Sequence, residues 1–281
     1  MKLCALIVGF AALFGLLLTI NAAGTPNPNA SRIDLNAVFK ALMMDMCNQK
    51  CSEDLKASIV KSLGLVDIYD NFAGLCTSYD NLNKCEKQRF CPKPSALVRL
   101  AIGGVEKLCS SDVQSQLMAH ADCLKQNADE TSQQCDQQCN FVGELADYTN
   151  EPVVKQGVNT LAILGQLGGV CGAFSCYIPC IQKELNGKCP GAASPITSSL
   201  LSPFYQLSDF VLKLSPAVQN MAKEKLPQNC LPLTNKTHLD EIWQGNQGQQ
   251  GQSGQQGQSG QEGQSGQQNN QTEQQNQKSH R

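Results

Sequence analysis

The sequence of 281 residues has little net charge, few aromatic residues and few histidines. Its formal net charge is −2, so the chain lacks the positive field that attracts nucleic acid or an anionic membrane surface. Aromatic residues make up 5% of the chain, and only three histidines are present. The core must therefore be built mainly from aliphatic residues, methionine and cysteine, which favours helices over strands.

The motifs of common enzymes are also missing. The sequence has no G-x-S-x-G, no H-E-x-x-H and no phosphate-binding loop. It has no C-x-x-C pair, which argues against a zinc site. His120 lies near Asp122, but the calcium loop of phospholipase A2 is absent, and helical spacing places His120 on an apolar face with Leu117 and Leu124. We therefore predict a non-enzymatic protein with no catalytic residue, no cofactor and no metal site.

The first residues are typical of a secretory signal peptide. Lys2 gives a positive start, an apolar run of 18 residues follows, and small residues from Ala22 to Gly24 suit cleavage. The run is also long enough for an uncleaved membrane anchor, but small residues stand where an anchor has a basic flank. We predict a signal peptide over residues 1–23, a secreted extracellular protein, and no membrane span after cleavage.

Cysteine is unusually frequent. Of 15 cysteines, Cys4 belongs to the predicted signal peptide, which leaves 15 − 1 = 14, enough for seven disulfides. Three C-x-x-x-C pairs occur. Residues four apart on a helix have Cβ atoms about 5 to 6 Å apart, whereas a disulfide needs roughly 3.8 Å. The members of each pair should therefore bond to other segments. The predicted disulfide cysteines are Cys47, Cys51, Cys76, Cys85, Cys91, Cys109, Cys123, Cys135, Cys139, Cys171, Cys176, Cys180, Cys189 and Cys230.

A second cysteine spacing recurs along the chain. Eight residues separate Cys76 from Cys85, and eight separate Cys180 from Cys189. This spacing raises an old internal duplication as a hypothesis, although the other cysteines do not follow the same pattern.

Helical periodicity and cap signals recur from residue 31 to residue 240, whereas strand-like alternation is scarce. Ser31 and Asp34 are candidate N-caps of a first helix, Ser52 of a second, and Asn150 with Pro152 begins a later one. Residues 110–126 and 131–148 each place apolar or cysteine side chains on one helical face. The sequence predicts an all-α, disulfide-stabilised domain over residues 31–240.

The composition changes abruptly at residue 245. Glutamine, glycine, serine and asparagine dominate residues 245–281, and the unit G-Q-S-G-Q-x is repeated three times within residues 251–268. Such a segment cannot offset its own ordering entropy by burying apolar surface, so we predict a disordered, low-complexity C-terminal tail.

The order of the cysteine-containing segments resembles the nematode chondroitin proteoglycan 4 domain. The resemblance is carried by "CNQKC", "LCTSYDNLNKCEKQRFC", "LCSSDVQSQLMAHADCLKQNADETSQQCDQQC" and "CGAFSCYIPCIQKELNGKC", and it covers about residues 40–190. It implies a secreted structural or interaction protein of the extracellular matrix, with matrix proteins or glycans as partners.

The resemblance also gives the tail a candidate role. Some family members carry chondroitin on serines of Ser-Gly dipeptides, which makes Ser253, Ser259 and Ser265 candidate sites of O-linked attachment in a proteoglycan. Chondroitin acceptor sites usually have acidic residues nearby, and here the repeat contains only Glu262. N-linked glycans are predicted separately at the sequons of Asn29, Asn235 and Asn270, outside the cysteine-bound region.

Other interpretations stay open at this point. The tail fits a bare spacer, or a transglutaminase substrate in which its glutamines and Lys278 are cross-linked. The helical part fits a carrier of lipid or another apolar ligand, with residues 158–174 lining a cavity, although the same residues fit an ordinary core helix.

Overall fold

The computed structural model describes residues 27–42, 44–63, 68–94, 96–157, 160–213 and 215–244. Within these residues the chain forms α-helices and short 3-10 helices and no strand, which confirms the all-α fold class. The predicted signal peptide and the glutamine-rich tail lie outside the described residues.

The helices follow one another with short connections. The first half contains η1 (Ala30–Arg32), α2 (Leu35–Ala41), α3 (Met46–Cys51), α4 (Glu53–Leu63), α5 (Ile68–Gln88), α6 (Ala96–Leu108) and α7 (Ser111–Ala119). The second half contains α8 (Ala121–Cys139), α9 (Phe141–Asn150), α10 (Pro152–Gln156), α11 (Thr160–Gly165), α12 (Gly168–Lys188), α13 (Ala193–Leu212), α14 (Pro216–Lys225), η2 (Gln228–Cys230), η3 (Pro232–Thr234) and α15 (Lys236–Trp243).

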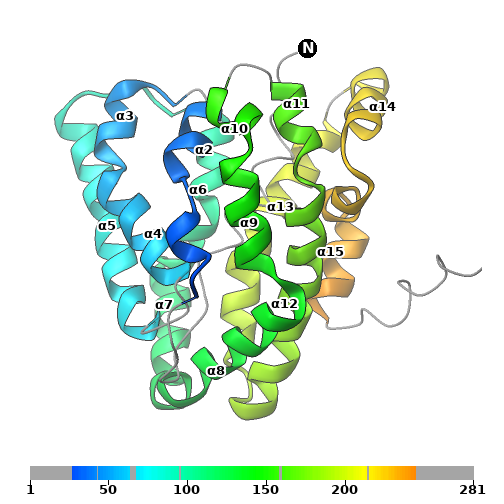
Figure 1. Cartoon of the computed structure of the whole chain (residues 1–281). Helices are drawn as coiled ribbons and strands as arrows, with labels where there is room; N and C mark the ends of the chain where they lie inside the picture. Colours follow the sequence, from blue (N-terminus) through cyan, green and yellow to red (C-terminus); the bar gives the residue numbers. More distant parts are fainter. Residues whose placement is uncertain are drawn as a thin grey trace, which may run out of the picture. The chain divides into compact units, whose positions relative to one another are not determined.

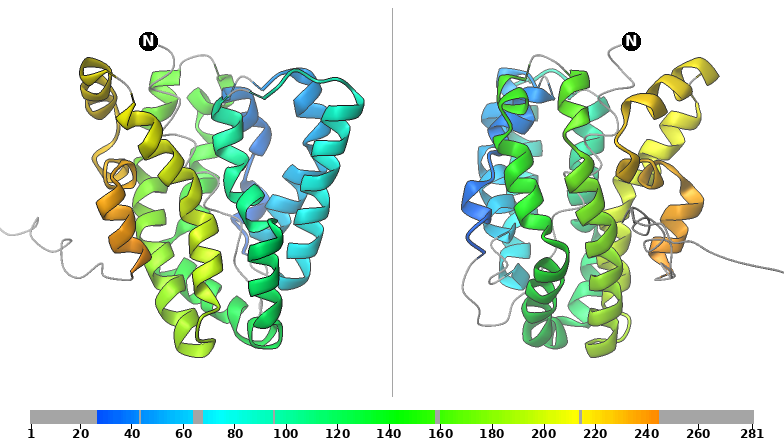
Figure 2. Two further views of the ribbon diagram at one scale, coloured as in Figure 1. Left: turned by 180° about the vertical axis from the view of Figure 1, so that it is seen from behind. Right: turned by 45° about the vertical axis from the view of Figure 1, so that its right-hand side comes forward.

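Neighbouring helices form two groups joined by a long helix pair. In the first group α3 and α4 pack against α5, and in the second α12 packs against α8, α9 and α13 (Figure 1). Helix α6 packs along α13 and so joins the two groups, as the view from behind shows (Figure 2). The short helix η1 contacts both α4 and α9, which adds a second contact between the groups, and α2 packs against α9 and α10.

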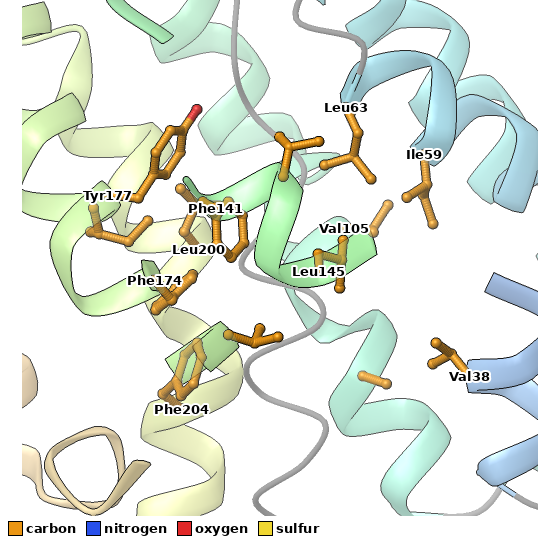
Figure 3. Close-up of a cluster of buried hydrophobic side chains, with 14 of the residues drawn as sticks. Val38, Ile59, Leu63, Val105, Phe141, Leu145, Phe174, Tyr177, Leu200 and Phe204 are labelled. Carbon is orange, nitrogen blue, oxygen red and sulfur yellow. The ribbon is translucent and has the colours of Figure 1, made fainter. Parts of the chain in front are cut away.

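A single hydrophobic cluster runs through both groups. On the α12 side it contains stacked Phe141 and Tyr177 rings, with centroids 5.2 Å apart, and Phe174 against Phe204 at 4.6 Å (Figure 3). On the α4 and α6 side it continues through aliphatic side chains such as Ile59, Leu63 and Val105. The domain therefore has one core, in which the rings of Phe141, Phe174, Tyr177 and Phe204 gather on the α12 side.

Of the four predicted N-caps, Asp34 is confirmed, Ser31 and Ser52 are wrong, and Asn150, described below, is wrong as well. Asp34 caps α2, because its carboxylate accepts hydrogen bonds from the backbone amides of Asn36 and Ala37. Ser31 lies inside η1, and its hydroxyl donates to the carbonyl of Pro28. Ser52 donates to the carbonyl of Gln49 at the end of α3 instead of accepting from α4. Both serine hydroxyls therefore serve the preceding turn.

The segments 110–126 and 131–148 do not form continuous helices, which corrects the single faces expected for them. The first breaks at His120, between α7 and α8, and the second breaks at Asn140, which adopts φ 51° between α8 and α9. Asp136 allows the second break, because its Oδ1 accepts a hydrogen bond from the Val142 amide at the start of α9, 2.8 Å away. Asparagine tolerates the left-handed backbone better than most residues.

The start of α10 also differs from the sequence prediction. Asn150 is the last residue of α9, and its side chain donates to the carbonyls of Arg32 and Ala146 instead of capping a new helix. Pro152 is the first residue of α10, as predicted, and Gly157 ends that helix with φ 68°.

Candidate functional site

The structure pairs all fourteen cysteines that follow Cys4. No C-x-x-x-C pair is bonded within itself, as the helical geometry predicted. The seven disulfides are Cys47–Cys91, Cys51–Cys85, Cys76–Cys109, Cys123–Cys189, Cys135–Cys180, Cys139–Cys176 and Cys171–Cys230.

Two of these disulfides hold α3 against the end of α5. Cys47 bonds to Cys91 and Cys51 bonds to Cys85, with Cα atoms 5.6 Å apart in both cases. We call this pair of bonds the N-terminal clamp. Helix α3 has only six residues, too few to be stable alone in water, so the clamp fixes its position and direction.

A second pair of disulfides holds α8 against α12. Cys135 bonds to Cys180 and Cys139 bonds to Cys176, with Cα atoms 5.7 Å apart in both cases. We call this pair the C-terminal clamp. The order of the bonds is nested, so the two helices run antiparallel between them. Cys135 is 0% exposed, which places this clamp at the edge of the core.

Each clamp is accompanied by a disulfide that leaves its loop. Cys76 lies inside the N-terminal clamp loop and bonds to Cys109 beyond it. Cys171 lies inside the C-terminal clamp loop and bonds to Cys230 beyond it. The connectivity therefore repeats between the two halves. The eight-residue spacing on which the duplication hypothesis first rested is not equivalent in the two halves, because Cys189 bonds backwards to Cys123.

A buried polar group lies where α8 ends. The carboxylate of Asp136 accepts hydrogen bonds from the Val142 amide and from Asn27 Nδ2, the latter at 2.6 Å. Burial raises the pKa of Asp136, while these hydrogen bonds oppose the rise. Burial, followed by the nearby Asp136 charge, raises the pKa of the Tyr177 hydroxyl well above its ordinary value. These groups hold the α8–α9 break and the loop before α2 in place.

The three histidines do not come together. His120 is half-buried and lies beside Gly191, whose Cβ position would be 3.6 Å from the imidazole. His238 Nδ1 lies 3.2 Å from Glu241 Oε2 on α15, and His280 is outside the described residues. In the described part of the chain, no group of three or more histidine, cysteine or acidic side chains is placed to hold a metal ion.

The end of α5 carries an exposed aromatic side chain that the sequence reasoning missed. Phe90 follows α5 in the left-handed region with φ 52°, and its side chain is 93% exposed. A bulky residue in this conformation costs about 1 to 3 kcal/mol, and an exposed ring gains no core packing in return. The disulfide to Cys91 and the following Pro92 fix this turn.

Exposed cationic residues flank Phe90 along the chain, and Lys50 of α3 lines the same hollow as Lys84 of α5. We call the whole surface the Phe90 edge, and it consists of Lys50, Lys84, Lys87, Arg89, Phe90 and Lys93. A surface hollow of about 330 Å³ lies beside the edge between α3, α4 and α5. Lys50, Lys84 and Gln88 line it towards the edge, and Glu53 and Asp54 line it towards α4.

The comparison with protein families decides which family this fold represents. The family model described as chondroitin proteoglycan 4 matches residues 36–238. The chain belongs to the chondroitin proteoglycan 4 family. The match confirms the resemblance seen in the sequence and extends it from about residues 40–190 to nearly the whole described domain, Cys230 included. Comparisons with curated proteins and with solved structures found no match.

The candidate glycan sites of this chondroitin proteoglycan 4 family member fall partly within the described residues. Asn29 precedes η1, and its Oδ1 accepts a hydrogen bond from Arg32. Asn235 is exposed and caps α15 by accepting from the Thr237 amide through Oδ1. Glycans attach to Nδ2, so these contacts leave the reacting atom of both side chains available. Asn270, Ser253, Ser259 and Ser265 lie outside the described residues.

The helices in the described residues of this family member are unlike membrane-spanning helices in length or hydropathy. None of them is both long enough and apolar enough to cross a bilayer.

Proposed function

We propose that this protein is a secreted, non-enzymatic component of an extracellular matrix whose tail serines Ser253, Ser259 and Ser265 carry chondroitin. The observation that carries the proposal is the chondroitin proteoglycan 4 family match over residues 36–238. The seven disulfides support it, because such bonds persist in oxidising extracellular compartments.

The folded domain and the tail have different tasks in this proposal. The cross-linked helices resist unfolding and present fixed surfaces to matrix proteins or glycans. The three Ser-Gly dipeptides follow one another at intervals of six residues in a segment of low complexity, whose composition predicts disorder and so access for a glycosyltransferase. N-linked glycans at Asn29 and Asn235 fit the same arrangement, since Asn235 is exposed and Asn29 is only half-buried.

The proposal is tested by the intact mass of the secreted protein before and after chondroitinase. We expect a heterogeneous high mass that collapses on digestion. Replacing Ser253, Ser259 and Ser265 by alanine should abolish the heterogeneity. The matched control replaces Ser111, Ser115 and Ser215, which are exposed and not followed by glycine, and should leave the heterogeneity unchanged.

A sharp mass that chondroitinase does not change would overturn chondroitin attachment. In that case isopeptide cross-links involving tail glutamines and Lys278 would identify a transglutaminase substrate, and their absence would leave a bare spacer. The same mass spectrum, recorded after treatment with an N-glycosidase, tests the predicted N-glycans.

The apolar-carrier alternative rests on residues 158–174. The structure places Leu164, Leu167, Val170 and Phe174 in the hydrophobic cluster, where each is at most 2% exposed. These contacts favour the core-helix interpretation of the segment. Lipid recovered stoichiometrically from the purified protein would instead support a carrier.

A further inference from the structure

The left-handed backbone of Phe90 belongs to the end of α5, where the Cys91 amide donates to the Glu86 carbonyl at 3.0 Å. The choice of a phenylalanine at this position is not explained by core packing. Among the described residues, only Phe90 and Asn140 combine a side chain with a positive φ. Asn140 is a residue type that tolerates this conformation, and a glycine or asparagine would end α5 at Phe90 without the same strain. The sequence instead keeps a large ring in solvent. Strain of this kind is characteristic of functional surfaces.

The cations of the Phe90 edge are available to a ligand. Lys84, Lys87, Arg89 and Lys93 lie within ten residues of chain, and Lys50 faces the same hollow as Lys84. All five side chains are exposed, and none takes part in an ion pair described for this structure. The dipole of α5 favours cations at its C-terminal end, which accounts for Lys84 and Lys87 but not for Lys50 or Lys93.

The nearby carboxylates leave the edge positive. Glu86 is partly buried on α5, where burial, followed by the charge of Asp45, raises its pKa. Glu53 pairs with Lys56 at 2.5 Å. Glu53 and Asp54 line the α4 side of the hollow, so an anionic ligand is favoured at the α5 side, which Lys84 and Gln88 line.

We propose that the Phe90 edge binds a sulfated glycosaminoglycan chain non-covalently. Such a chain repeats carboxylate and sulfate groups along its length, and lysine and arginine pair with both. The apolar C–H face of a sugar ring can pack on an exposed aromatic ring, which gives the side chain of Phe90 a role that a purely ionic site would not need. The edge would attach the folded domain to polysaccharide chains of the surrounding matrix.

This inference goes beyond the proposed function and does not depend on it. Chondroitin attachment concerns tail serines, whereas this surface lies on α3, α5 and the following turn. The test therefore uses full-length protein made in a host that forms disulfides but makes no glycosaminoglycan. Its result is independent of whether Ser253, Ser259 or Ser265 is modified in the natural source.

The experiment measures the affinity for an end-labelled chondroitin sulfate oligosaccharide by fluorescence anisotropy at two salt concentrations. We expect saturable binding that weakens at high salt. Replacing Lys84, Lys87 and Arg89 by alanine should weaken binding about tenfold, since three exposed ion pairs of modest strength are lost. The matched control makes the same change in charge elsewhere, with alanine at Lys155, Lys213 and Lys225, and should stay within about twofold of the wild-type affinity.

The Phe90→Gly variant separates a binding role from a structural one. Glycine removes the ring and relieves the positive φ, so we expect weaker binding, by about fivefold, together with unchanged or higher thermal stability. A Phe90→Trp variant should retain binding. A structural role would instead lower stability in Phe90→Gly and leave the affinity of the folded protein unchanged.

Several results would overturn the inference. These are absence of saturable binding to the oligosaccharide, equal loss of affinity in the edge and control variants, and wild-type affinity in Phe90→Gly. Tighter binding to vesicles of phosphatidylserine and phosphatidylcholine than to the oligosaccharide would also overturn it, in favour of a membrane surface. An unsulfated chondroitin oligosaccharide should bind more weakly than the sulfated one, and equal affinity for both would contradict recognition of sulfate.

Discussion

The N-terminal and C-terminal clamps use the same arrangement of cysteines in two different surroundings. Both join a C-x-x-x-C helix to a second helix through two nested disulfides. The C-terminal clamp adjoins the stacked rings of Phe141 and Tyr177, and Cys135 is fully buried there. The N-terminal clamp holds the short helix α3 beside a hollow and an exposed phenylalanine. One clamp therefore supports the core, and the other supports a surface.

This difference suggests why a disulfide-rich domain needs both kinds of support. Where helices are long and their faces apolar, cross-links add to packing that is already extensive. Where a helix is short and its neighbourhood charged, cross-links supply most of what holds it. The four predictions below test this contrast, from the largest expected effect to the smallest.

The first prediction compares removal of one disulfide from each clamp. Loops of this length stabilise a protein by about 4 kcal/mol per disulfide in the chain-entropy model. Replacing Cys135 and Cys180 by alanine should lower the free energy of unfolding by slightly more than this, because Cys135 is fully buried in the core whereas Cys51 is 7% exposed. Replacing Cys51 and Cys85 should cost less and act mainly on α3. Denaturant unfolding gives the global stability, and hydrogen exchange gives the local effect. The contrast would be contradicted if both variants lost the same free energy of unfolding and hydrogen exchange in α3 did not increase selectively in the variant that lacks Cys51–Cys85.

The second prediction concerns the aromatic end of the core. Phe174 is fully buried against Phe141 and Phe204, so Phe174→Ala should lower the free energy of unfolding by about 3 to 5 kcal/mol. Unfolding in denaturant with intact disulfides is the measurement. The control is Leu212→Ala, at a side chain 63% exposed, which should change stability by less than about 0.5 kcal/mol. Similar effects of the two substitutions would show that the rings do not carry the packing.

The third prediction sharpens the contrast at the surface. Phe90→Gly should raise the free energy of unfolding by about 1 kcal/mol, because it removes the strain of a positive φ without loss of packing. Thermal unfolding detects a change of this size. Arg89→Gly is the control, since Arg89 has no positive φ to relieve and should gain nothing. A loss of stability in Phe90→Gly would mean that the ring contributes to folding.

The fourth prediction concerns the pH dependence at the α8–α9 break. Because burial raises the pKa of Asp136 in the folded protein above its ordinary value of 3.8, the unfolded chain ionises first as the pH rises. The stability of the wild type should therefore fall, relative to Asp136→Asn, as the pH rises from below 3.8 through the raised pKa. Unfolding free energies of both proteins across this range provide the check, and a constant difference would contradict it.

The sequence was sufficient to predict the fold class, and to predict that the cysteines of each C-x-x-x-C pair bond to other segments and not to each other. Helical periodicity is a local property, and the Cβ separation of residues four apart excluded bonds within each C-x-x-x-C pair. The partner of each cysteine, such as Cys180 for Cys135, depends on how distant helices pack, and no local signal contains that information.

Helix boundaries were less predictable, for an identifiable reason. The break at Asn140 depends on Asp136 accepting a hydrogen bond from the start of the next helix, so periodicity through residues 131–148 concealed it. Ser52 looked like an N-cap because its residue type is common there, but its hydroxyl found a closer acceptor in the preceding turn.

The Phe90 edge shows why a functional surface is hard to predict from local sequence. The basic residues from Lys84 to Lys93 form a local positive surface that the net charge of −2 for the whole chain does not reveal. The exposure and the positive φ of Phe90 appear only once α5 ends at Gln88. A phenylalanine between basic residues and a Cys-Pro pair is the sequence pattern that indicates this surface.

The disulfide connectivity also determines how the molecule would respond to mechanical tension. In the described part of the chain, bonds interlock Cys47 through Cys109 and, separately, Cys123 through Cys230, and none crosses from one set to the other. When the two ends of the domain are pulled apart, the disulfide bonds within each set carry the force. The segment that contains α7, between Cys109 and Cys123, is the only covalent link between the two sets, which otherwise meet through noncovalent packing such as that of α6 on α13. Once that packing gives way, this segment bears the load through its backbone. Tension would therefore separate two compact, cross-linked units before it could lengthen either one.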